Sequence, residues 1–162
     1  MGLDQTFYKC KVTKWKAYKE QLEAYEKVQT DEKEDTFEHP GRNFDPEEIG
    51  YFRKVNFLMR EFAYYGNCEY KEISRDELER LRKKCERLAG FQPRETPEGE
   101  EVYSDEARQL ASELLPTCSG FFFGSTDYDD VYFQNIHEVL EWVTGVLNAL
   151  GNDEVVLMYC WW

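Results

Sequence analysis

The sequence has fewer basic than acidic residues and no long apolar run, and these two shortages argue against nucleic-acid binding and against a membrane span. Its 162 residues carry 33 acidic side chains against 20 basic ones, which gives a formal charge of −13 at pH 7. This balance opposes direct binding to nucleic acid, because the phosphates would be repelled. No stretch approaches about 18 consecutive apolar residues, so no membrane-spanning helix is expected. The opening MGLDQTFYKC also lacks a signal-peptide pattern, and we therefore expect a cytoplasmic protein.

Motifs of catalysis and metal binding are missing as well. The five cysteines are scattered and form no CxxC pair, so a zinc ribbon or a thiol redox site is not supported. Free thiols in a reducing compartment are the simplest interpretation. There is no P-loop, dinucleotide-binding, zinc-protease or nucleophile-elbow motif, and only His39 and His137 could supply an imidazole base. We therefore predict no catalytic residues, no metal ligands and no cofactor.

Apolar periodicity predicts a single compact α+β domain over residues 1–162. About five helices would pack on a small sheet formed by N-terminal, central and C-terminal strands. The strands are expected at residues 3–12, 68–73 and 154–162, with the last one laid against the first. The helices are expected at residues 14–35, 46–65, 74–89, 104–115 and 130–150. Residues 91–103 contain two prolines and a glycine and are expected to form a surface loop.

The expected helix at residues 46–65 carries polar groups on an otherwise apolar face. Asp45 is its predicted N-cap, and Pro46 is its predicted first residue. Arg53 and Asn56 stand three residues apart, so on a helix they would share one face. A buried amide such as that of Asn56 must find hydrogen-bond partners. This face is therefore a candidate surface for a ligand.

The segment CSGFFFGSTDYDD, residues 118–130, places three phenylalanines between two glycines. We predict that Phe121 to Phe123 form a buried strand, and that Gly120 and Gly124 mark a bend or a close backbone approach. Asp127, Asp129 and Asp130 resemble the start of a calcium-binding loop but lack its glycine and its final glutamate. We interpret these carboxylates as caps of the long helix that follows.

The end of the predicted Phe-rich strand lies beside the start of a helix, where small-ligand sites often form in mixed folds. We therefore predict a binding site between the 46–65 helix and the 118–128 segment. Its candidate residues are Arg53, Asn56, Ser119, Ser125, Thr126, Asp127 and Tyr128. Tyr128 would stack on a base, and Arg53 would meet a phosphate. Arg53 could equally form a structural ion pair with Asp127 or Asp129, and the sequence leaves both interpretations open.

The segments EIGYFRKVNFLMREF and LLPTCSGFFFGSTDYDDVYF, together with the MGLD start, resemble a family of small bacteriophage and prophage proteins. That family begins with MGLD, carries YWRKAN-like and LPTQSGFFFGSTDYD-like segments, and is largely uncharacterised in function. The matching motif residues are Arg53, Lys54, Asn56, Ser119, Gly120, Gly124, Ser125, Thr126, Asp127 and Tyr128. This sequence departs from the pattern at Met59, where the family has histidine, and at Cys118, where it has glutamine.

The resemblance implies a phage or prophage accessory protein, for example one that acts in counter-defence. The residues then admit binding of a small nucleotide-like ligand. They also admit an acidic inhibitor that occupies the basic face of a host nucleic-acid-binding protein. A nucleotide-processing enzyme is the least supported class, because no base, nucleophile or metal-ligand set is present. The sequence does not decide whether the acidic surface is functional or only solubilising, and it leaves room for a homo-oligomer.

Overall fold

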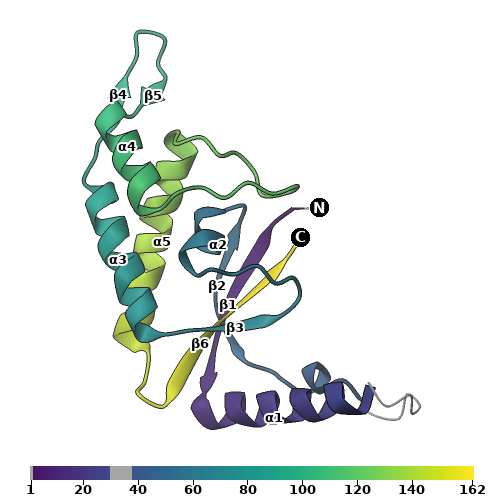
Figure 1. Ribbon diagram of the computed structural model, residues 1–162. Coiled ribbons are helices and arrows are strands. Elements are labelled where there is room, and N and C mark those ends of the chain that lie inside the picture. The colour runs from purple at the N-terminus through teal and green to yellow at the C-terminus, as the bar shows by residue number, and fades with distance from the viewer. Residues whose placement is uncertain (1, 30–37) are drawn as a thin grey trace.

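The computed structural model describes residues 2–29 and 38–162 and confirms the α+β fold (Figure 1). One antiparallel sheet has the strand order β2-β1-β6-β3. Its strands are β1 Asp4–Lys11, β2 Glu47–Arg53, β3 Tyr70–Ile73 and β6 Glu154–Trp161. The helices are α1 Val12–Gln29, α2 Phe57–Glu61, α3 Arg75–Ala89, α4 Asp105–Leu114 and α5 Asp130–Ala149, with a 3-10 turn η1 at Pro40–Arg42. A separate two-stranded hairpin joins β4 Arg94–Glu95 to β5 Glu101–Val102.

The two ends of the chain form the centre of the sheet, as the sequence predicts. β1 and β6 pair in antiparallel register from Asp4 opposite Trp161 to Lys11 opposite Glu154. Both strands therefore have a neighbour on each side, which suits the apolar run of β6. The N- and C-termini consequently lie at the same end of the sheet (Figure 1).

Each face of the sheet has its own apolar cluster. On one face, α3 and α5 lie side by side and bury Phe7 and Met158 of the central strands (Figure 1). On the other face, α1 lies across one end of the sheet, where Trp15 and Tyr18 pack with Phe44. The part of α1 expected at residues 30–35 lies outside the described residues. Most of the core therefore lies between the sheet and the α3–α5 pair.

The predicted helix at residues 46–65 is wrong. Residues 47–53 form the edge strand β2, and only Phe57–Glu61 form a short helix. Phe7 pairs with Gly50 and Tyr8 pairs with Glu48, so Ile49 is an extra residue in a β-bulge. The bulge leaves Ile49 and Phe52 on the core side of the strand although they are three residues apart. Because of the bulge, the apolar residues of this strand show the three-residue spacing that is typical of a helix.

The Phe-rich segment is a turn and not a buried strand. Phe121 is 89% exposed and Phe123 is buried, so the two rings do not share one side of a strand. The amide of Phe123 donates to the carbonyl of Gly120 at 3.2 Å, and its ring folds back over that glycine. A Cβ on Gly120 would lie 2.6 Å from the ring, which confirms the predicted close approach.

The expected loop at 91–103 is also corrected, because it contains the β4–β5 hairpin.

The other helices follow from their caps. Ser74 and Glu77 form a complete capping box at the start of α3, and Ser104 caps α4. Asp129 caps α5 by accepting a hydrogen bond from the amide of Tyr132 at 3.0 Å. This last contact confirms that a carboxylate just ahead of the long helix serves as its cap.

Candidate ligand cleft

A cleft of about 250 Å³ lies where the end of β2 faces the first turns of α5. It is lined by Arg53, Lys54, Val55, Asn56, Phe57, Thr117, Gly124, Ser125, Asp127, Asp129, Val131, Tyr132 and Asn135. Four of the seven predicted ligand-binding residues meet here: Arg53, Asn56, Ser125 and Asp127. The structure thus brings residues 53–57 against the 117–127 segment, although no helix spans residues 46–65.

Asn56 joins these two segments. Its side-chain amide donates to the carbonyl of Phe123 at 3.1 Å and to that of Ser125 at 2.8 Å. Its side-chain oxygen accepts a hydrogen bond from the amide of Cys118 at 3.2 Å. The residue is only 3% exposed, so its polar atoms need partners within the protein, and these three hydrogen bonds to the turn supply them. Asn56 is therefore a clamp that shapes the cleft, and its polar atoms do not need a ligand.

A second buried amide fixes the neighbouring backbone. Gln5 is fully buried, and its side chain exchanges two hydrogen bonds with the main chain of Val55, at 3.0 and 3.1 Å. The N-terminal segment adds two more links, because Leu3 donates to the carbonyl of Phe122 at 3.1 Å and accepts from the amide of Lys54 at 2.8 Å. β1, the end of β2 and the Phe-rich turn are therefore held as one unit.

Lys54 has an unusual backbone. Its φ of 60° lies in the left-handed region, which a residue with a side chain seldom adopts. Gly124, which faces it, has a φ of 89°, and a Cβ there would lie 3.2 Å from the Cβ of Lys54. Gly124 thus leaves room for the stem of Lys54. A strained conformation held in this way is often associated with a functional position.

The cleft contains two cations, Arg53 and Lys54, that have no acidic partner among the described residues. Arg53 and Lys54 are both exposed, and neither forms an ion pair with an acidic residue in the described ranges. The structural ion pair from Arg53 to Asp127 or Asp129 is therefore not formed. The hydroxyl of Tyr51 next to Arg53 donates to Asp4, which raises the pKa of that phenol, and Arg53 opposes the shift. Arg53 thus lies against Tyr51, and no acidic residue of the described ranges neutralises either basic side chain.

The acids of the cleft differ in their roles. Asp129 is engaged as the N-cap of α5, whereas Asp127 is exposed and shows no side-chain hydrogen bond to the described residues. The amide of Asp127 donates to the hydroxyl of Ser125 at 3.0 Å, which orders the turn. Tyr132 is buried behind the cleft, and burial raises the pKa of its phenol, which donates to the carbonyl of Leu115 at 2.8 Å. Asp127 is therefore the cleft carboxylate that the described residues leave without a side-chain hydrogen bond.

Three predicted site residues lie outside the cleft. Ser119 is exposed on the Phe-rich turn, and Thr126 and Tyr128 line a neighbouring acidic hollow that also contains Asp130. The hydroxyl of Tyr128 accepts a hydrogen bond from the amide of Thr117 at 3.2 Å. Its ring packs edge-on against that of Tyr132 with 5.0 Å between the ring centroids. Tyr128 therefore packs against the wall of the cleft, and its stacking on a base stays a prediction.

Sequence reasoning missed the contribution of α5 to the cleft. Val131 and Asn135 stand four residues apart on the first turns of α5 and line the same cleft as Lys54. Val131 is 55% exposed, although it is apolar. An apolar residue beside a polar one on the outer face of a helix was a usable signal. The apolar periodicity of α5 indicates its buried face, and Val131 lies outside that face.

Comparison with protein-family models, curated proteins and solved structures found no match for the chain. The resemblance to phage and prophage proteins therefore stays a prediction. Within residues 2–29 and 38–162, none of the helices is sufficiently long and apolar to cross a membrane. The same ranges contain no group of three or more histidine, cysteine or acidic side chains placed to hold a metal ion. All five cysteines are unpaired.

Proposed function

We propose that this protein binds a small nucleotide-like anion in the cleft between residues 53–57 and 117–135. One observation carries the proposal. Arg53 and Lys54 are adjacent, exposed and without an acidic partner in the described residues, and both line a cleft whose framework is fixed by buried amides. A preformed concave site with a few oriented polar groups is typical of small-molecule binding.

The polar groups of the cleft suit both ends of such a ligand. The guanidinium of Arg53 offers a planar fork to phosphate oxygens, and Lys54 adds a compact positive charge. Asp127 would accept hydrogen bonds from sugar hydroxyls or from an exocyclic amine of a base. A cavity of about 250 Å³ is small for a ligand pocket. We therefore infer that it encloses the phosphate and sugar and leaves the base near the exposed Val131.

The alternative of an acidic inhibitor has less support. It would use a continuous acidic surface against the basic face of a host protein. The described part of α1, however, carries four lysines and three glutamates: Lys14, Lys16, Lys19, Lys27, Glu20, Glu23 and Glu26. This helix therefore presents mixed charge. An accessory role in a phage or prophage, including counter-defence, is proposed on the resemblance alone.

Calorimetric titration tests the proposal. The ligands are the ribonucleoside monophosphates, the matching nucleosides and inorganic phosphate, at low and at physiological salt. We expect a monophosphate to bind, and Arg53→Gln to weaken it at least about tenfold because a charge-assisted hydrogen-bond fork is lost. The control is Lys16→Gln, which removes one charge from an exposed part of α1. Equal affinity for nucleosides and nucleotides, or an unchanged affinity in Arg53→Gln, would refute the proposal.

A further inference from the structure

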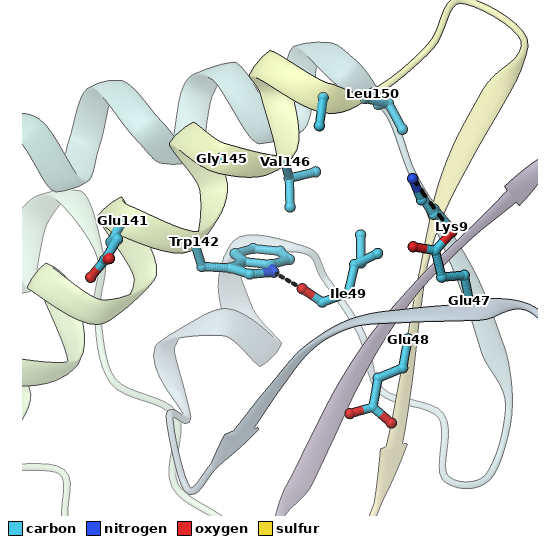
Figure 2. Close-up of a pocket in the computed structure, with 10 residues that line it drawn as sticks. Lys9, Glu47, Glu48, Ile49, Glu141, Trp142, Gly145, Val146 and Leu150 are labelled. Carbon is cyan, nitrogen blue, oxygen red and sulfur yellow. Dashed lines mark hydrogen bonds and ion pairs between the residues drawn. The ribbon is translucent and has the colours of Figure 1, made fainter.

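A second hollow lies between the other end of β2 and the C-terminal half of α5, and we refer to it as the α5–β2 groove (Figure 2). Its volume is about 390 Å³. Half-buried apolar side chains form its floor, namely Ile49, Trp142, Val146 and Leu150. It shares no lining residue with the cleft at Arg53. The two hollows therefore lie at opposite ends of the same strand–helix pair.

The floor of the groove is held rigidly. The indole nitrogen of Trp142 donates to the carbonyl of Ile49 at 2.8 Å, and Figure 2 shows this bond along one side of the groove. The ring of Trp142 also packs on Phe7 at 4.4 Å between ring centroids. Gly50 admits the ring, because a Cβ there would lie 2.3 Å from the indole nitrogen. The position of Trp142 is therefore set by the sheet and does not depend on a ligand.

Gly145 leaves the groove open. It lies inside α5, where glycine is a poor helix former, and a Cβ at this position would meet no atom within 4 Å. Neither backbone conformation nor packing therefore requires a glycine here. The missing side chain instead widens the groove above Trp142 and Val146 (Figure 2). An occupant with a bulky apolar side chain would use this space.

The rim of the groove is acidic. Glu47 and Glu48 of β2 and Glu141 of α5 line it, and all three are exposed. The one basic residue in the lining is Lys9, which is paired with Glu47 at 3.4 Å. The carboxylates of Glu48 and Glu141 therefore have no basic partner among the residues that the structure describes, in a protein whose formal charge is −13. Such a rim attracts a positively charged occupant and repels a second copy of this acidic chain.

We propose that the α5–β2 groove docks an extended segment of a partner protein in which one bulky apolar side chain is flanked by lysine or arginine. The apolar side chain would sit over Trp142 beside Gly145, and the basic residues would meet the carboxylates of Glu48 and Glu141. The outer edge of β2 has no strand partner in the described residues, so an extended segment can run alongside it. This role goes beyond the proposed ligand cleft and does not depend on it.

Short peptides test the charge and the apolar anchor separately. The probe is an acetylated and amidated Lys-Lys-Leu-Lys-Lys peptide, and its controls are Glu-Glu-Leu-Glu-Glu and Lys-Lys-Ser-Lys-Lys. Binding is read from the indole N–H resonance of Trp142, which Trp142→Phe identifies. We expect the probe to bind at least about tenfold more tightly than either control, because each control lacks one of the two complementary features.

Two leucine variants distinguish binding in the groove from non-specific hydrophobic binding elsewhere on the protein. Gly145→Leu places a side chain in the open space, and we expect it to weaken the probe at least about tenfold while the protein stays folded. Gln134→Leu adds an exposed leucine on the same helix outside the groove and should leave binding unchanged. Any one of three results would overturn the proposal. The three peptides could bind equally, the probe could fail to bind at millimolar concentration, or Gly145→Leu could bind the probe as tightly as the unsubstituted protein.

Discussion

Lys54 and Gly124 face each other with both backbones in the left-handed region, at φ values of 60° and 89°. Glycine adopts this region without cost, whereas a residue with a Cβ is strained there. The strain at Lys54 is maintained by its amide hydrogen bond of 2.8 Å to the carbonyl of Leu3. A basic side chain is therefore held at the cleft by a backbone that would suit glycine better.

Replacement of Lys54 separates stability from binding. In Lys54→Gly the relief of the left-handed strain is offset by the greater freedom of glycine in the unfolded chain, so the free energy of unfolding should change by less than about 1 kcal/mol. Nucleotide affinity should nevertheless fall, because one of the two cleft cations is lost. Urea denaturation and calorimetric titration of the same preparation measure the two quantities. Lys54→Gln, which keeps the strain, should show the same loss of affinity, and undiminished affinity in both variants would contradict the role of this cation.

Asn56→Ala should be strongly destabilising. The substitution leaves two carbonyls and one amide of the 118–125 turn without their partner, and buried unpaired groups cost on the order of 2–4 kcal/mol together. Chemical denaturation measures the loss. Asn135→Ala is the matched control, since Asn135 lines the same cleft on α5 and should change the unfolding free energy by less than about 0.5 kcal/mol. Equal effects of the two substitutions would show that Asn56 is not the clamp.

Much of the fold could be predicted from local signals, and the main error has a physical cause. Capping residues and 3.6-residue periodicity located α3, α4 and α5, and the apolar run of β6 indicated a central strand. β2 was mistaken for part of a helix because the bulge at Ile49 changes its two-residue alternation. Its pairing with β1 joins residues that are far apart in the sequence, from Asp4 opposite Arg53 to Lys9 opposite Glu47, and local periodicity contains no information about such a pairing.

The cleft was predictable only in part. Arg53, Asn56, Ser125 and Asp127 were expected and do line it, but Asn56 is used as a clamp. The expected ring of Tyr128 lies outside it, because its hydroxyl accepts from the amide of Thr117 and its edge meets Tyr132. Hydrogen bonds between a loop and a ring depend on tertiary packing. Residue types and spacing therefore indicate which segments meet, but not which side chains face the ligand.

Gly50, which lies against the ring of Trp142, and Gly145, which lines the α5–β2 groove, should respond in opposite directions to alanine. Gly50→Ala places a Cβ 2.3 Å from the indole nitrogen of Trp142, so the ring must move, and we expect a destabilisation of about 1–3 kcal/mol. Gly145→Ala meets no atom within 4 Å and should stabilise α5 by about 0.5–1 kcal/mol. Thermal unfolding of both variants shows whether each substitution raises or lowers the stability of the protein. A stabilising Gly50→Ala would contradict the packing of Trp142 on β2.

Stability should fall in alkaline solution. Burial raises the pKa of the Cys85 and Cys160 thiols from 9.0 to about 12, so the folded protein holds these protons more tightly than the unfolded chain. The resulting stabilisation is complete below about pH 9 and is lost as the pH rises toward the folded values. Chemical denaturation at several pH values above neutrality measures how steeply the free energy of unfolding falls with pH. Cys85→Ala should make the decline shallower, and an identical slope would contradict the buried, neutral state of this thiol.

Amide chemical shifts during titration with a ribonucleoside monophosphate test the proposed cleft most directly. We expect the shifts to concentrate in residues 53–57, 124–127 and 131–135, to reverse on dilution, and to vanish in Arg53→Gln while that variant keeps the spectrum of a folded protein. The same titration with the matching nucleoside should give much smaller shifts, because the phosphate is the group that Arg53 and Lys54 bind. Shifts centred elsewhere, or none up to millimolar nucleotide, would contradict the assignment of this cleft as the binding site.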